Sequence, residues 1–269
     1  MDIKKLLTRT ISGIVYIGII IGCIFWGFEP FNWMAAIFAA IAIHEFEKIT
    51  RELNPRTLPI LLIDIFGAIS LVFGWMLYPL VVWVFIILCR MILQLYIKSE
   101  TPLADIARSI MSQIYIGLPL GLMVLLAYIW HLHAILAIFL MIWLNDTGAF
   151  LVGSMIGKHR LFERISPKKS WEGFFGGLFF DLIAATLFGL YCSEFFRLEI
   201  GVAEWIGLGT VVCIFSTWGD LVESMIKRTL HIKDSGNLIP GHGGILDRID
   251  SLLFVMPASL IYLTILSNF

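Results

Sequence analysis

The chain has 269 residues, of which 59% are apolar and only 14% are charged, and its mean hydropathy is +0.91. Soluble domains carry about 25% charged residues, so this composition excludes an ordinary water-soluble globule. The 21 phenylalanines and 9 tryptophans disfavour disorder, because disordered segments contain few large apolar residues. The formal net charge of −1 disfavours a nucleic-acid partner held by positive charge. The sequence therefore predicts an all-α polytopic membrane protein with no nucleic-acid partner.

The N-terminal segment resembles a secretory signal at first sight, because Lys4, Lys5 and Arg9 precede an apolar run over residues 11–28. That run is long for the apolar part of a signal and lacks a small-residue cleavage site. We expect it to remain as the first membrane span.

Apolar runs separated by polar or proline-marked breaks indicate about nine transmembrane helices, since one helix needs about 20 mostly apolar residues to cross a bilayer. The expected spans cover residues 11–28, 31–48, 59–77, 79–97, 104–130, 134–153, 172–193, 202–226 and 249–267. The first break is predicted at Glu29-Pro30. Pairs of glycines spaced as G-x-x-x-G at residues 18–22, 117–121 and 173–177 indicate close helix packing and leave a homodimer open.

The basic residues predict an orientation with the N-terminus in the cytoplasm and the C-terminus outside. Lys and Arg are enriched in short cytoplasmic loops, and with nine spans 18 of the 19 Lys and Arg residues fall at the inner face. Arg90 belongs to these because it lies towards the inner end of the fourth span, whereas Arg197 falls outside. One span more or fewer would remove this agreement.

Two inner-face loops, residues 154–171 and 227–248, contain most of the polar motifs. The second loop and the helix ends beside it read SMIKR at residues 224–228, KDSG at 233–236 and PGHGGILDRID at 240–250. Both loops lie in the C-terminal half of the chain. Because both loops are predicted at the inner face, the predicted chemistry is concentrated on one side of the membrane.

Carboxylates and hydroxyls share helix faces beside the second loop. The spacing of Asp220, Glu223, Ser224 and Lys227 places them on one face of the eighth helix. Asp247 and Asp250 likewise share a face at the start of the ninth helix. Hard oxygen ligands of this kind suit Mg²⁺, which normally also binds water and substrate phosphates.

The same loop combines glycines with positive charge. The backbone amides of its glycines, near a helix N-terminus, suit phosphate oxygens. The glycines are Gly241, Gly243 and Gly244, and the cations are Lys227, Arg228, Lys233 and Arg248. Anionic lipid headgroups would also explain cations at a membrane surface, but they would not explain the carboxylates. The combination favours phosphoryl or nucleotidyl transfer over a pore.

The run from Ser224 to Asp250 resembles the signature of the phosphatidate cytidylyltransferase family, also called CDP-diacylglycerol synthases. The pattern is S-x-φ-K-R-x4-K-D-x-[small]-x2-φ-[P/G]-x-H-G-G-φ-x-D-R-φ-D, with φ apolar, and every constrained position over 27 residues agrees. Residues 166–173 and Asn145-Asp146-Thr147-Gly148 also resemble that family. The resemblance implies that CTP and phosphatidate react to give CDP-diacylglycerol and pyrophosphate, with Mg²⁺ required and a second cation left open.

Residue roles follow from this resemblance. The implied metal ligands are Asp220, Asp247 and Asp250. The implied catalytic residues are Asp220, Lys227, Arg228, Lys233, Asp234, His242, Asp247, Arg248 and Asp250. The implied substrate-binding residues are Ser166, Lys168, Lys169, Ser170, Glu172, Ser224, Gly243 and Gly244. Which cation binds which phosphate stays open, and Asp146 is equally well explained as a functional group or as a structural partner of Lys168 or Lys169.

The resemblance further implies a multi-pass protein of the bacterial inner membrane, with its active site facing the cytoplasm. We expect residues 1–100 to form N-terminal transmembrane helices and residues 101–269 to form the catalytic region. A transporter for an anionic solute is the alternative from another class, but transporter sites usually lie near the membrane midplane. A CDP-alcohol phosphotransferase is disfavoured because its D-G-x2-A-R spacing is absent. The segment His44-Glu45-Phe46-Glu47-Lys48 lacks the second histidine of a zinc protease.

Overall fold

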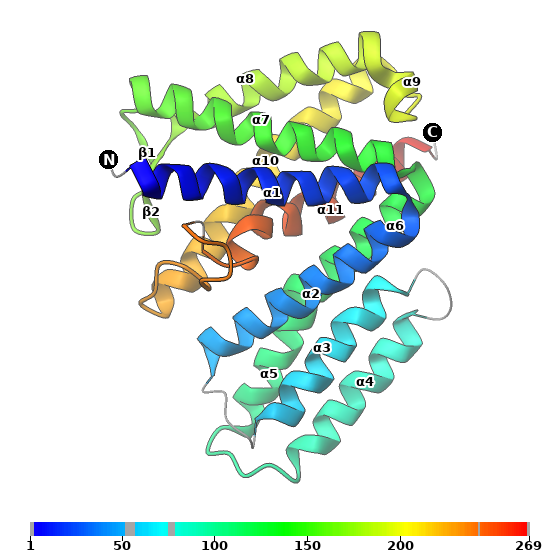
Figure 1. The fold of residues 1–269 in the computed structure, drawn as a ribbon, viewed down its shortest axis with the longest axis vertical. Coiled ribbons are helices and arrows are strands. Elements are labelled where there is room, and N and C mark those ends of the chain that lie inside the picture. The colour runs from blue at the N-terminus through cyan, green and yellow to red at the C-terminus, as the bar shows by residue number, and fades with distance from the viewer. Residues whose placement is uncertain (1–2, 52–56, 75–78, 242, 268–269) are drawn as a thin grey trace. The chain divides into compact units, whose positions relative to one another are not determined.

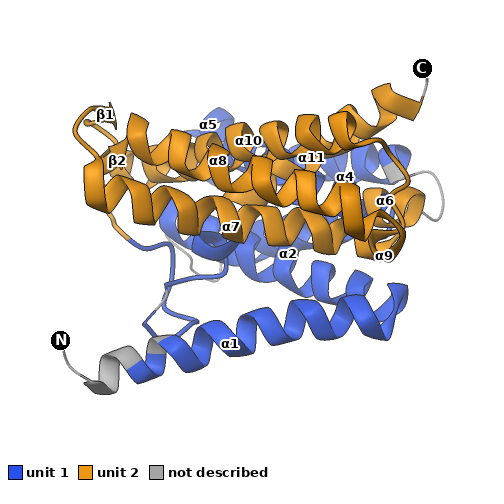
Figure 2. Ribbon diagram, turned by 90° about the horizontal axis from the view of Figure 1, so that it is seen from above, with its two compact units in different colours: residues 1–125, 234–249 blue, residues 126–233, 250–269 orange. Residues whose placement is uncertain are grey.

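The structure is a computed structural model that describes residues 3–51, 57–74, 79–241 and 243–267. The chain forms two compact units, which Figure 2 shows in different colours. Unit 1 comprises Met1–Leu125 and Asp234–Ile249, and unit 2 comprises Leu126–Lys233 and Asp250–Phe269. The predicted division at residue 100 rests on function rather than on compactness and stays a prediction.

Helices make up nearly all of the regular structure (Figure 1). The first half contains α1 Ile3–Trp26, α2 Phe28–Thr50, α3 Leu58–Val72, α4 Pro79–Gln94, α5 Pro102–Ser112 and α6 Leu118–Trp130. The second half contains α7 Leu132–Ile156, α8 Trp171–Leu187, α9 Ser193–Phe196, α10 Val202–Thr229 and α11 Leu246–Ser267. Turns of π-helix at Gln113–Gly117 and Phe188–Cys192 join α5 to α6 and α8 to α9.

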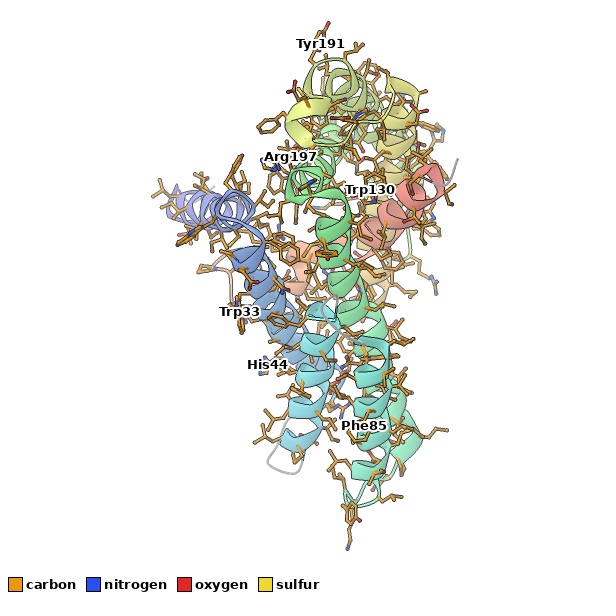
Figure 3. All side chains as sticks on the ribbon, turned by 90° about the vertical axis from the view of Figure 1, so that its right-hand side faces the viewer. Trp33, His44, Phe85, Trp130, Tyr191 and Arg197 are labelled. Carbon is orange, nitrogen blue, oxygen red and sulfur yellow. The ribbon has the colours of Figure 1, made fainter. Side chains whose placement is uncertain are left out.

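In the described part of the chain, five helical segments are long and apolar enough to cross a membrane. They are Pro102–Trp130, Leu132–Ile156, Trp171–Phe196, Val202–Thr229 and Leu246–Ser267. Shorter apolar helices cover Thr10–Trp26, Leu58–Val72 and Leu80–Gln94. Large apolar side chains such as Trp33 and Phe85 are exposed on the outside of unit 1 (Figure 3), as expected for helices that face lipid. The prediction of a helical membrane protein is confirmed, while nine spans and the orientation stay predictions.

The first helix break lies at Gly27 and not at the predicted Glu29-Pro30. Gly27 adopts φ +133°, in the region that favours glycine, and α2 begins directly after it. Pro30 therefore falls in the first turn of a helix, where its missing N–H breaks no hydrogen bond. The prediction placed the break within three residues of its observed position, but the break is at Gly27 and not at Pro30.

A small β-hairpin lies between α7 and α8, where only helices and loops were predicted. Strand β1, Arg160–Phe162, pairs antiparallel with β2, Ser166–Ser170. In the observed register Arg160 lies opposite Ser170, and Phe162 lies opposite Ser166. Part of the predicted 154–171 loop is thus a β-hairpin with antiparallel strand pairing.

Close packing accompanies two of the three predicted glycine pairs. In unit 1, a Cβ atom at Gly121 would lie 2.7 Å from the carbonyl oxygen of Leu71 on α3. In unit 2, a Cβ atom at Gly173 would lie 2.9 Å from the carbonyl oxygen of Ala149 on α7. No described atom lies within 4 Å of a Cβ built at Gly18 or Gly22.

Candidate functional site

The centre of the candidate site in unit 2 is an ion pair between the hairpin and α10. Lys169 Nζ on β2 lies 2.8 Å from Asp220 Oδ2 on α10. The Ser224 hydroxyl, one helical turn after Asp220, donates to Asp220 Oδ1 at 3.1 Å. Three residues predicted from the sequence to bind metal or substrate are thus in direct contact.

A cavity of about 590 Å³ opens beside this ion pair within unit 2. Its wall contains Asp220, Lys169 and Lys168, together with Asp146 from α7 and Arg160 from β1. Arg160 was not among the predicted site residues, because it lies outside the sequence motifs and is not on a predicted helix that contains them. Its strand pairing with Ser170 brings it there. The cavity therefore combines positive side chains, which suit phosphates, with carboxylates, which suit a cation.

Asp250 on α11 is not one of the cavity-lining residues, but it interacts electrostatically with three of them. Its carboxyl lies within electrostatic range of Asp220, Asp146 and Lys169, and it accepts a hydrogen bond from the backbone N–H of Ser251 at 2.7 Å. The helices are in close contact here, since a Cβ atom at Gly219 would lie 2.7 Å from the Asp250 carbonyl oxygen. Glycine at position 219 allows α10 to approach α11.

The predicted cations at the end of α10 have different surroundings. Lys227 forms an ion pair with Glu223, whose side chain is almost completely buried. Arg228 is exposed and donates from Nε to the carbonyl oxygen of Ile165 at 3.5 Å, beside the hairpin. Lys233 is exposed. The structure therefore links Lys227 and Arg228 to protein groups of unit 2, while their role with phosphates stays a prediction.

The predicted residues from the first loop hold the start of α8. The buried Ser170 hydroxyl accepts from the Gly173 amide at 3.1 Å, which is an N-cap interaction. Glu172 Oε1 lies 2.6 Å from His159 Nδ1, and both Glu172 oxygens accept from the His159 amide. Ser166 is half-buried at the start of β2, and Lys168 is exposed. Ser170 and Glu172 thus have structural contacts that their sequence positions alone did not reveal.

The predicted glycine-rich segment belongs to unit 1, where it surrounds the carboxylate of Asp247. Asp247 Oδ2 accepts from the Gly244 amide at 2.8 Å, and from the amide and hydroxyl of Ser235, each at 2.9 Å. Gly243 adopts φ +87°, and a Cβ atom there would collide with Asp247 Oδ2. The Gly244 amide, predicted to bind phosphate, is therefore a donor to Asp247 in this structure.

The remaining predicted residues of this segment are less constrained. Asp234 and Arg248 are exposed. Tyr16 on α1 donates to the Arg248 carbonyl oxygen at 3.2 Å. The predicted catalytic residue His242 lies outside the described residues.

Glu45, which is not among the predicted site residues, contacts the same glycine-rich segment. This α2 residue is 5% exposed and accepts from the backbone amides of Ile245 and Leu246 at 3.1 and 2.9 Å. Its neighbour His44 faces outward (Figure 3). An acidic residue in an apolar helix was the available signal, because such a group needs a partner when it is buried.

The carboxylates in unit 2 have the chemistry that Mg²⁺ requires. Asp220 and Asp250 supply hard oxygen ligands within electrostatic range of each other. Within the described ranges, no group of three or more His, Cys, Asp or Glu side chains is close enough to hold a metal ion. Mg²⁺ usually takes only one or two protein carboxylates plus water and phosphates, so the residues present fit that ion. The predicted ligand Asp247 belongs to unit 1.

Comparison with known proteins gives matches over most of the chain. The profile described as "Cytidylyltransferase family" matches residues 7–266. A protein of Staphylococcus haemolyticus (strain JCSC1435) named phosphatidate cytidylyltransferase is 35% identical over 263 residues, which cover 93% of this chain and 95% of that protein. A protein of the same name from Staphylococcus aureus (strain COL) is 46% identical over 161 residues, and this match spans 60% of each chain.

Proposed function

Since the chain belongs to the cytidylyltransferase family, we propose that it transfers a cytidylyl group from CTP to phosphatidate, giving CDP-diacylglycerol and pyrophosphate. The observation that carries this proposal is the unit 2 cavity, where Lys169 pairs with Asp220 beside Lys168, Arg160 and Asp146. Two polyanionic substrates need such cations, and a magnesium nucleotide needs such carboxylates. The relatives named phosphatidate cytidylyltransferase support the same reaction.

In this reaction an oxygen of the phosphatidate phosphate attacks the α-phosphorus of CTP. A new phosphorus–oxygen bond forms, the bond from the α-phosphorus to the oxygen bridging the β-phosphate breaks, and pyrophosphate leaves with that electron pair. The attacking phosphate is already ionised, so no strong general base is required. The protein has to align the two substrates and stabilise the developing negative charge.

The basic and acidic residues of unit 2 have different proposed roles in this reaction. Lys168, Lys169 and Arg160 would bind phosphate oxygens, and Asp220 and Asp250 would hold Mg²⁺, alone or with a second cation. The bound ion supplies neutralisation of the nucleotide phosphates. Ser224 orients Asp220 through its hydrogen bond. By resemblance to the family motif, Asp247 would be a further metal ligand, and catalysis or phosphate binding would involve Asp234, His242, Arg248, Lys227, Arg228 and Lys233.

We further propose nine spans with the N-terminus and the active site at the cytoplasmic face of a bacterial inner membrane. The distribution of Lys and Arg supports this orientation. CTP then enters from water and phosphatidate enters laterally from the bilayer. Polar residues near helix ends serve this arrangement, because they meet both phases.

The decisive test is CTP-dependent conversion of phosphatidate to CDP-diacylglycerol by purified protein in detergent, with Mg²⁺ or with EDTA. The expected result is product that requires both CTP and Mg²⁺, with pyrophosphate released in equal amount. Folded protein that forms no product with several lipids and nucleotides would contradict the proposal. Transport assays with anionic solutes would then be the next measurement.

A further inference from the structure

The residue before α11 cannot cap this helix with its side chain. Helices usually begin after Ser, Thr, Asp or Asn, whose side chain accepts from the first backbone amides. Here the residue before α11 is Ile245, whose side chain has no acceptor. The acceptors come instead from a residue 200 positions earlier, since Glu45 on α2 binds the amides of Ile245 and Leu246.

Residues 235–236 and 243–247 of the motif, called the motif segment below, contain the groups that pack around the Glu45 carboxylate. A Cβ atom at Gly236 would lie 2.7 Å from Glu45 Oε1, and one at Gly244 would collide with Glu45 Oε2. Ser235 Oγ lies 3.4 Å from Glu45 Oε2 and donates at the shorter distance of 2.9 Å to Asp247 Oδ2. The two glycines therefore make room for a buried carboxylate, and two of the residues that contact it, Ser235 and Gly244, also donate to Asp247.

We propose that Glu45 is a positioning residue for the reaction, which holds Ser235 and residues 244–246 in the conformation that orients the Asp247 carboxylate. This inference rests on the proposed function, in which Asp247 is a metal ligand. A negative charge is favourable at a helix N-terminus because it meets the positive end of the helix dipole. Hydrogen bonds from amides to a carboxylate are also stronger than those to a neutral acceptor.

The test compares Glu45→Gln with Glu47→Gln. The amide variant keeps the size of Glu45 but points an NH₂ donor towards backbone donors. Glu47 is the matched control, because it is also buried on α2 and in unit 1, but it forms an ion pair with Arg51. Glu45→Asp is a second variant, which keeps both acceptor oxygens on a shorter side chain and remains usable if Glu45→Gln does not fold.

The first measurement is hydrogen exchange of the backbone amides in residues 243–249 of the detergent-solubilised full chain. Glu45→Gln is expected to raise the exchange rate there about tenfold, with Glu45→Asp between it and the wild type. Glu47→Gln is expected to leave this segment unchanged. Wild-type exchange in the folded Glu45 variants would overturn the proposal.

The second measurement is the Mg²⁺ concentration that gives half-maximal activity. Loss of an outer residue that orients a metal ligand typically costs about 10- to 100-fold in metal affinity or activity. Glu45→Gln is therefore expected to raise this concentration about tenfold while the KM for CTP at saturating Mg²⁺ changes less than about twofold. An unchanged Mg²⁺ dependence would overturn the proposal. A wild-type protein without activity would refute the proposed function instead, and the exchange comparison would still decide whether Glu45 holds the segment.

Discussion

Lys169 and Asp220 join the hairpin to α10 through a contact of 2.8 Å between Nζ and Oδ2. Their side chains remain 27% and 36% exposed, respectively. A partly exposed pair of this kind contributes only about 0–1 kcal/mol to stability. Both residues line the same cavity, so the contact brings together a cation and a carboxylate to which the proposed mechanism gives separate roles.

Replacing Lys169 by Met is therefore expected to separate activity from stability. Activity should fall about 100-fold or more, because in the proposed mechanism the variant loses a charge that stabilises the transferring phosphate. The thermal midpoint should change little, since the ion pair adds little stability. Steady-state kinetics and thermal unfolding in detergent provide the two readouts. Lys158→Met is the control, because Lys158 is exposed in the same loop and is not among the cavity-lining residues. Activity of Lys169→Met within about threefold of wild type would refute the assignment.

Asp247 offers a test of charge against hydrogen bonding. Asn at this position keeps a carbonyl oxygen that can accept the three hydrogen bonds now made to Oδ2, whereas Ala cannot. Both substitutions should reduce activity at least about 100-fold, because both remove a negative charge from the proposed metal site. Only Ala should also destabilise the fold, by about 1–3 kcal/mol. A stable, fully active Asp247→Asn protein would rule out a metal-ligand role.

Hydropathy predicted the helices well, because each predicted apolar run in the sequence lies largely within observed helix. The positions of the helix breaks were predicted less accurately, as Gly27 shows. Proline often marks a helix boundary, but Pro30 is tolerated in the first turn of α2. The hairpin was not predicted because β2 contains Pro167 and two lysines, without an alternating apolar pattern. Its strand pairing depends on β1, which has only three residues.

The motif predicted which residues carry the proposed chemistry but not all of their contacts. Spacing on α10 indicated that Asp220 and Ser224 share a face, and they are hydrogen-bonded. It did not reveal Glu45, because the partners of Glu45 are backbone amides 200 residues away. Backbone groups have no sequence signature, so contacts of this kind require the fold.

Gly243 tests the shape of the motif segment. Gly243→Ala introduces a Cβ at φ +87° that would collide with Asp247 Oδ2. We expect a destabilisation of about 1–3 kcal/mol and a large loss of activity, since the Asp247 carboxylate would have to move. Gly18→Ala is the matched control, because no described atom lies within 4 Å of a Cβ at that position. Equal unfolding midpoints and equal activities for the two variants would contradict the predicted collision.

A buried polar network in unit 1 supports the final prediction, which concerns stability. Arg90 is 1% exposed and donates from Nε to Ser109 Oγ at 2.8 Å, while Ser109 donates to Asp64 Oδ2 at 2.7 Å. Arg90→Met would leave the Asp64 carboxylate buried without this positive neighbour. Leaving one of two mutually compensating buried charges without the other costs about 3–5 kcal/mol, whereas replacing both groups by apolar side chains is often nearly neutral.

Unfolding in detergent should therefore show Arg90→Met as strongly destabilised and the double variant Arg90→Met with Asp64→Leu as at least half recovered. Arg108→Met is the control, because Arg108 pairs with Asp105 at 2.6 Å but its side chain is 35% exposed. That variant should lose no more than about 1 kcal/mol. If the double variant were less stable than Arg90→Met alone, Asp64 would have a stabilising role independent of Arg90, and the charge-compensation argument for this network would be wrong.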